Sequence, residues 1–270
     1  MEGLKELEEA QRLALAGNAD DAEKAFSALA KAGSTPAAAA LSTLYAYVGD
    51  WERVLGHAQK AIADPEGTYT FNVYSDVIRL AARAARETRQ WSLLSEAVGE
   101  ALLHFVEVDD EIGLVDELED LREYLDLADP NRVFPTVSEP EIGALEEFRE
   151  AVREATADDG QFDSPEERSE HLYSLAAVYE VEEGALELFD RGEPVPPDFE
   201  AAVFLAGALA SAVRYDEAWN VVERALLEWM PVEVSQLAPV EFLTHPTLQL
   251  VMAPDRCGRI LHTPRGSAGQ

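Results

Sequence analysis

One pattern recurs along this chain: an amphipathic stretch long enough for a helix, a tight turn, and a second amphipathic stretch. In the clearest copy, the turn Gly49-Asp50-Trp51 is followed by apolar residues at helical spacing until Asp64-Pro65 ends the stretch. Similar turns lie at 17–22 and 214–218. A pair of short helices cannot bury its own apolar face, so each pair must stack on a neighbour. The pattern therefore predicts an all-α solenoid of helix-turn-helix hairpins.

The copies are spaced nearly regularly in the first part of the chain. The turns at Gly17 and Gly49 are 32 residues apart, and the step from Trp51 to the next equivalent tryptophan, Trp91, is 40 residues. A further copy is expected at 201–231. Small and aromatic residues occupy the inward positions of these hairpins: Ala22, Phe26, Leu29, Ser42, Tyr45, Val54, Ala58, Ala61, Ala218, Val222 and Ala225.

With this spacing and these packing positions, roughly half of the chain resembles the tetratricopeptide-repeat family, whose period is about 34 residues. The resemblance implies a right-handed superhelix of helical hairpins. It also implies a scaffold that binds peptides or proteins. Such a resemblance is specific for the fold and says little about a particular function.

The composition and the positions of helix-capping and helix-breaking residues divide the chain into four parts. A helix is expected to start at Ser164-Pro165, where serine suits the N-cap and proline the first turn, and to continue towards Phe189. After Pro231 the chain breaks into short apolar pieces separated by prolines, which suit a cap over the open end of the last hairpin. The expected parts are three N-terminal tetratricopeptide-like hairpins (1–106), an irregular acidic helical segment (107–163), C-terminal helical hairpins including one tetratricopeptide-like repeat (164–231), and capping helices with a flexible tail (232–270).

The charge is strongly negative and unevenly placed. Acidic residues outnumber basic residues by 53 to 21, for a formal net charge of −32. This charge repels phosphate backbones and anionic lipid headgroups, so neither nucleic acid nor a membrane is expected as a partner. Residues 1–90 carry 13 acidic and 10 basic residues, whereas residues 107–163 carry 20 and 4. Five carboxylates of the second range flank the apolar positions of one predicted helix: Asp116, Glu117, Glu119, Asp120 and Glu123.

Two interpretations of these five carboxylates remain open. They are the solvated face of an amphipathic helix in the first interpretation. In the second, they form an acidic docking surface for a basic protein or peptide.

Three arginines of the third hairpin share one helical face. Arg79, Arg83 and Arg86 are spaced i, i+4 and i+7, which aligns their guanidinium groups. Aligned on the tetratricopeptide pattern, these arginines and Tyr47 resemble groove-lining residues, and the resemblance implies that the arginines clamp a carboxylate of a bound peptide. Alternatively, the arginines pair with the acidic segment that follows and balance charge within the fold.

No catalytic, cofactor-binding or metal-binding pattern is recognisable. The five histidines are scattered, and the single cysteine, Cys257, excludes an internal disulfide. Glycine-rich phosphate loops and nucleophile elbows are also absent. The first residues lack a secretory pattern, and the longest apolar run, 201–213, is too short to cross a bilayer. We therefore expect a cytoplasmic protein that is not an enzyme.

The leading hypothesis is an adaptor that binds a partner's peptide or helix in its concave groove, through Tyr47, Arg79, Arg83 and Arg86. The alternative is an acidic inhibitor or immunity-type protein that covers a basic effector, such as a toxin or nuclease, with the surface of residues 107–163. The oligomeric state stays open in both.

Overall fold

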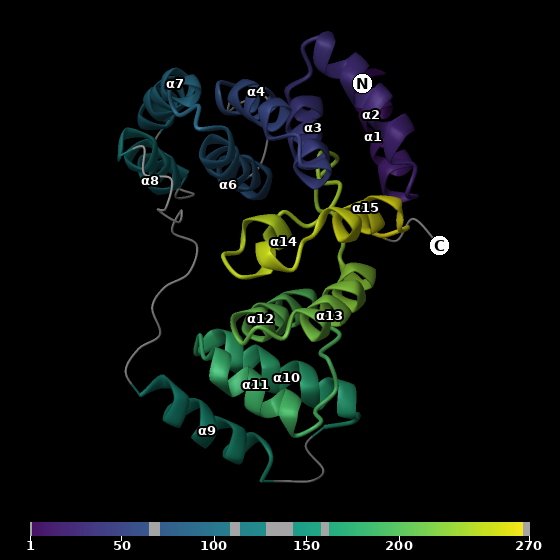
Figure 1. Ribbon diagram of the computed structural model, residues 1–270, viewed down its shortest axis with the longest axis vertical. Coiled ribbons are helices and arrows are strands. Elements are labelled where there is room, and N and C mark those ends of the chain that lie inside the picture. The colour runs from purple at the N-terminus through teal and green to yellow at the C-terminus, as the bar shows by residue number, and fades with distance from the viewer. Residues whose placement is uncertain (1, 65–70, 109–113, 128–142, 158–161, 267–270) are drawn as a thin grey trace. The chain divides into compact units, whose positions relative to one another are not determined.

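The computed structural model describes residues 2–64, 71–108, 114–127, 143–157 and 162–266. Within these ranges the chain forms helices joined by turns and irregular stretches, with no strand. Most helices that follow one another in sequence pack against each other, as the all-α hairpin pattern predicts (Figure 1). No helix in the described ranges is both long enough and apolar enough to cross a membrane. The contacts divide the chain into two compact units.

The first unit combines the N-terminal helices with two short helices from near the C-terminus. Its helices are α1 (Glu2–Leu15), α2 (Ala19–Lys31), α3 (Thr35–Val48), α4 (Trp51–Ile62), α6 (Phe71–Thr88), α7 (Ser92–Val108), α8 (Leu114–Leu127), α14 (Glu241–Thr244) and α15 (Pro254–His262).

The turn predicted at Gly49-Asp50 joins α3 to α4. Gly49 ends α3 with a left-handed backbone (φ 81°), which glycine adopts without steric cost. The Asp50 side chain caps α4 by accepting a hydrogen bond from the main-chain N–H of Arg53 at 3.2 Å. The two adjacent residues thus end one helix and begin the next, which confirms the predicted turn.

Helix α3 is the most enclosed helix of this unit. It packs against α2, α4, α6 and α15, and side chains on all its faces are buried, including Leu41, Leu44 and Tyr47. The run of alanines at 37–40 lets neighbouring helices approach closely. Each large apolar side chain buried here contributes about 1.5–3 kcal/mol to stability.

The second unit is formed by the helices that follow residue 143 and by one short piece near the C-terminus. Its helices are α9 (Ala144–Ala155), α10 (Pro165–Val178), α11 (Glu182–Asp190), α12 (Phe199–Ser211), α13 (Tyr215–Glu228) and the single 3₁₀ turn η1 (Leu248–Leu250).

The helix expected from Ser164 towards Phe189 is instead two helices. Ser164 caps α10 as predicted, by accepting from the main-chain N–H of Glu167 at 3.0 Å. Two residues before α11, however, Glu180 adopts a left-handed backbone (φ 53°), and the N–H of Val181 bonds back to the carbonyl of Ala176 at 2.9 Å. This reversal closes a helical hairpin at a site without glycine or proline, and it corrects the expectation of one continuous helix.

The chain after residue 230 contributes to both units. Helix α14 packs against α6 and α15 packs against α3, so both belong to the N-terminal hairpins (Figure 1). Residues 245–252 belong to the second unit, where η1 packs on α12, the first helix of the last hairpin. Of the region expected to cap the last hairpin, residues 245–252 are thus the part that contacts it.

His245 anchors the short piece on α12. Its imidazole lies against Gly207, where an added Cβ atom would come within 2.9 Å of the ring. The ring Nδ1 accepts from the main-chain N–H groups of Thr247 (3.4 Å) and Leu248 (3.5 Å), and the Thr247 hydroxyl donates to the Gly207 carbonyl at 3.1 Å. Burial lowers the pKa of His245, while the nearby carboxylate of Glu182 opposes the shift. The folded state therefore favours the neutral imidazole.

We expect this preference to make the second unit less stable in mild acid. Because the unfolded chain binds the proton more readily, stability is complete above the ordinary histidine pKa of 6.5 and declines as the pH falls below it. Urea unfolding at pH 7.5, 6.5 and 5.5 measures the decline. The His245→Gln variant should lose less stability over this range than the wild type; equal losses in the two proteins would contradict the assignment to His245.

Candidate functional site

Tyr47 lies in the interior of the first unit and binds a main-chain carbonyl. Its side chain is 2% exposed, and its hydroxyl donates to the carbonyl oxygen of Pro239 at 2.6 Å. Burial raises the pKa of the Tyr47 phenol well above its ordinary value. The phenol therefore stays protonated and serves as a hydrogen-bond donor at neutral pH.

Arg83 on α6 binds a second carbonyl of the same stretch. Its Nη1 donates to the carbonyl oxygen of Leu243, and the guanidinium lies over the indole of Trp51, 4.5 Å from the ring centroid. Glu87 lies 3.9 Å from Nε. Burial lowers the pKa of Arg83 to about 10, so the side chain remains charged at neutral pH. A cation stacked on an indole is held in one orientation, which directs its donors at the carbonyl.

The other two arginines of the predicted stripe have different surroundings. Arg79 interacts electrostatically with the carboxylate of Glu241, the first residue of α14. Burial raises the pKa of Glu241, and Arg79 counteracts this shift by favouring the ionised form. Arg86 lies 3.4 Å from Glu87 on its own helix. The structure thus places Tyr47, Arg79 and Arg83 around residues 239–243, whereas Arg86 forms an ion pair within α6.

The stretch that meets these side chains was not identified from the sequence as a component of the site. Pro239 and Leu243 lie 192 residues from Tyr47 and 160 residues from Arg83 along the chain. From its sequence, Pro239-Val240-Glu241-Phe242-Leu243 is predicted only to be one of the short apolar pieces of a cap. Its pairing with α3 and α6 depends on long-range packing.

The acidic helix predicted within residues 107–163 is α8. Four of its five named carboxylates are exposed: Asp116, Glu119, Asp120 and Glu123; the side chain of Glu117 lies outside the described residues. Glu119 forms an ion pair with Arg122 at 3.4 Å. The parts of the acidic segment at 109–113, 128–142 and 158–161 also lie outside the described residues.

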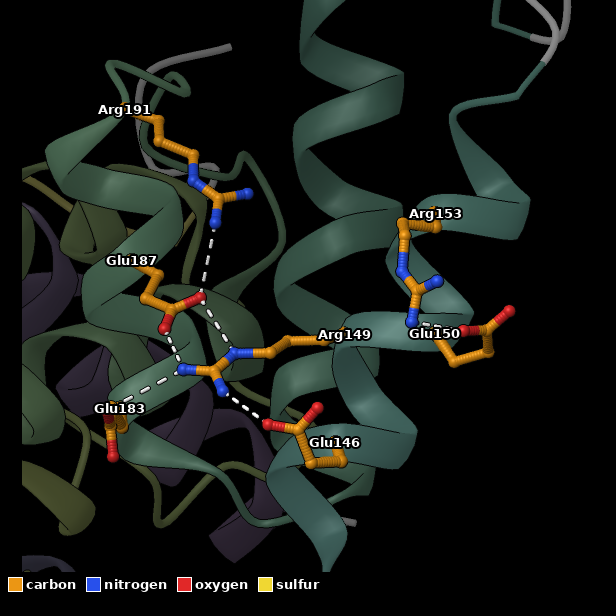
Figure 2. Close-up of polar contacts among 7 residues, drawn as sticks. All are labelled: Glu146, Arg149, Glu150, Arg153, Glu183, Glu187 and Arg191. Carbon is orange, nitrogen blue, oxygen red and sulfur yellow. Dashed lines mark hydrogen bonds and ion pairs between the residues drawn. The ribbon is translucent and has the colours of Figure 1, made fainter.

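A second cluster of charges links two helices of the second unit (Figure 2). The guanidinium of Arg149 on α9 bonds to Glu187 on α11 and, at 2.6 Å, to Glu146 on its own helix. Glu183 lies 3.8 Å away, and Arg191 bonds to Glu187 at 3.3 Å. Hydrogen bonds to Glu187 and Glu146 raise the pKa of Arg149, and the bond from Arg149 lowers the pKa of Glu187. Each charged side chain of this cluster thus lies near one of opposite sign, as expected of a structural network.

Within the described ranges, no group of three or more histidine, cysteine or carboxylate side chains is arranged so that it could hold a metal ion. An open pocket of about 590 Å³ lies at the turn between α3 and α4 and is lined by Val48, Gly49, Asp50, Trp51, Glu52, Glu87 and Thr88. Its rim is exposed and acidic.

Comparison with protein-family models, with curated proteins and with solved structures gave no match to this chain.

Proposed function

We propose that this protein is a non-catalytic adaptor of the tetratricopeptide type, which binds a partner peptide on the face formed by α3 and α6. One observation carries the proposal: Tyr47 and Arg83, from successive hairpins, each donate to a main-chain carbonyl of a segment that is mostly not helical. Donors directed at main-chain carbonyls bind a peptide largely independently of its sequence. Arg79 adds selectivity for a carboxylate.

The proposal includes the finer features of the fold. Consecutive helix packing and the inward small residues support a tetratricopeptide arrangement, and the right-handed superhelical sense comes with that resemblance. The contact of η1 with α12 supports a capping role for part of the chain between 232 and 262. The partner is a protein or peptide, in keeping with the donors that line the face, and the proposed location is the cytoplasm.

Peptide display on the immobilised full chain tests the proposed function. Peptides that bind the wild type should be lost from Arg83→Met and weakened on Tyr47→Phe, because each change removes one carbonyl donor. Arg224→Met is a matched control, since Arg224 is exposed on α13 in the second unit. Failure to select any peptide whose binding requires Arg83 would overturn the adaptor proposal.

The exposed carboxylates of α8 favour the acidic inhibitor as a second candidate function. Asp116, Glu119 and Asp120 are all exposed on the polar side of one helix, while Leu118 and Leu121 of that helix are buried. A basic protein would meet several unburied carboxylates at once, and the attraction would fall steeply with salt.

We expect charge reversal on α8 to separate the two candidates. If the inhibitor function holds, the triple lysine variant at Asp116, Glu119 and Asp120 should bind a panel of basic nucleases at least ten-fold more weakly in about 0.05 M salt. Lysine substitutions at Glu6, Glu8 and Asp20, which are also exposed, change the net charge equally and serve as the control. Equal weakening in both variants would indicate attraction to the overall charge and would contradict a docking surface on α8.

A further inference from the structure

Residues 235–244 occupy the face to which the proposed function assigns the partner. Tyr47 and Arg83 bind the carbonyls of Pro239 and Leu243. At the start of the segment, the Gln236 side chain donates to Asp76 of α6 at 3.4 Å. The donors of α3 and α6 are therefore used by the chain itself.

Apolar side chains of the same segment are buried, and helix α14 within it packs against α6. Val240 and Leu243 are 2% and 1% exposed, and the Phe242 ring is fully buried. Glu241 lies between them, with its carboxylate in the field of Arg79. The segment thus presents two carbonyls, one carboxylate and three apolar side chains within five residues.

The segment cannot keep this conformation without the face. Helix α14 has four residues, far fewer than the roughly 12 that an isolated helix needs in water. The rest of the segment, residues 235–240, has no regular structure and leads directly into this single helical turn. Its order derives from contacts that another peptide with the same groups could replace.

Tethering determines how strongly the segment competes with a partner. An intramolecular occupant acts at an effective concentration of about 1 mM or more, so a free peptide with identical contacts binds the occupied face only weakly. Freeing the face raises the apparent affinity in proportion to the fraction of molecules in the open state.

We infer that residues 235–244 are an internal ligand that blocks this face. The external ligand then belongs to the same chemical class: a peptide with a proline, a carboxylate two residues later, and an aromatic and an aliphatic residue directly after it. This inference rests on the proposed function, because it assigns the ligand class and the regulation of the same site. A partner carrying such a sequence displaces the internal segment.

A labelled synthetic peptide of residues 235–244 tests the inference by fluorescence anisotropy against the full chain. In the Phe242→Ala protein, which loses the main apolar anchor of the segment, the peptide should bind at least ten-fold more tightly than in the wild type. Adding Arg83→Met to this variant should abolish the gain. Leu248→Ala removes a buried side chain from η1 in the second unit and should leave binding unchanged. Circular dichroism verifies that each variant keeps its helices.

A second measurement uses the wild type and does not depend on how the variants fold. Excess unlabelled peptide should expose the internal segment and raise the rate of chymotrypsin cleavage after Phe242 or Leu243 several-fold. Equal affinity of the wild type and Phe242→Ala for the peptide, or cleavage unaffected by the peptide, would overturn the inference. If displayed peptides still bind in an Arg83-dependent manner, the adaptor function survives that result; if none binds, the adaptor function fails as well.

Discussion

Replacing Arg265 with methionine is expected to lower the free energy of unfolding of the first unit by about 3 kcal/mol. The Arg265 side chain is 3% exposed, and its Nε donates to the carbonyl of Leu237 at 2.6 Å. Its Nη1 donates to the carbonyls of Ile260 at 2.9 Å and Thr263 at 3.0 Å. Burial lowers the pKa of Arg265 to about 10, so the group is charged at neutral pH.

The size of this effect follows from what the guanidinium joins. Ile260 lies in the last turn of α15, so a positive charge there also meets the negative end of the helix dipole. Leu237 lies in residues 235–244, so one side chain ties α15 to the segment that occupies the α3–α6 face. Methionine fills similar volume but leaves several buried carbonyls without a donor, each at a cost of about 1–3 kcal/mol.

Urea unfolding followed by circular dichroism measures this change. Arg259→Met alters the net charge equally from an exposed position on α15, and it should change stability by less than about 0.5 kcal/mol. Comparable stability of the Arg265→Met and Arg259→Met proteins would contradict the role assigned to the buried carbonyl bonds. The Arg265→Met variant should also expose residues 235–244 to chymotrypsin, since it releases Leu237.

The helical hairpins could be predicted because their signals are local. Gly49 and Asp50 are adjacent, and their effects on helix end and helix start act within one turn of the chain. The break between α10 and α11 carries no such signal. Glu180 adopts the left-handed backbone there because the packing of two helices requires a reversal, and its sequence neighbours resemble those of an uninterrupted helix.

Only the tyrosine and the arginines of the candidate site could be predicted from the sequence, and the segment that they contact could not. Helical spacing places Arg79 and Arg83 on a common face from sequence alone, and the structure has both of them near residues 239–243. The occupant of that face lies 160 or more residues away along the chain, and no periodicity relates the two stretches. The pairing of Arg149 with Glu187 could not be predicted for a similar reason. The chain has many carboxylates, and tertiary packing determines which of them lies next to Arg149.

Helices α9 and α11 pack closely enough that one glycine sets their separation. A Cβ atom added at Gly184 would lie 2.5 Å from Cε1 and 2.7 Å from Cδ1 of Phe148, closer than real side chains approach. The Phe148 ring is 2% exposed, so it cannot swing into solvent. The Arg149–Glu187 bond joins the same two helices (Figure 2).

Gly184→Ala is therefore expected to destabilise the second unit by up to about 2 kcal/mol, although alanine is the better helix former. Overpacking costs about 1–3 kcal/mol, and it exceeds the roughly 1 kcal/mol that alanine gains over glycine in a helix. Gly56→Ala on α4 is the matched control, because nothing lies within 4 Å of its added Cβ. That control should stabilise the protein by about 0.5–1 kcal/mol.

Opposite signs for these two glycine substitutions, measured by urea unfolding, would establish the close contact between α9 and α11. Adding Phe148→Leu to Gly184→Ala should recover part of the loss, since the smaller side chain removes the ring atoms that clash. If Gly184→Ala instead stabilised the protein, α9 would have to lie farther from α11 than the contact between Gly184 and Phe148 implies. The Arg149–Glu187 bond would then also be too long to hold the two helices together.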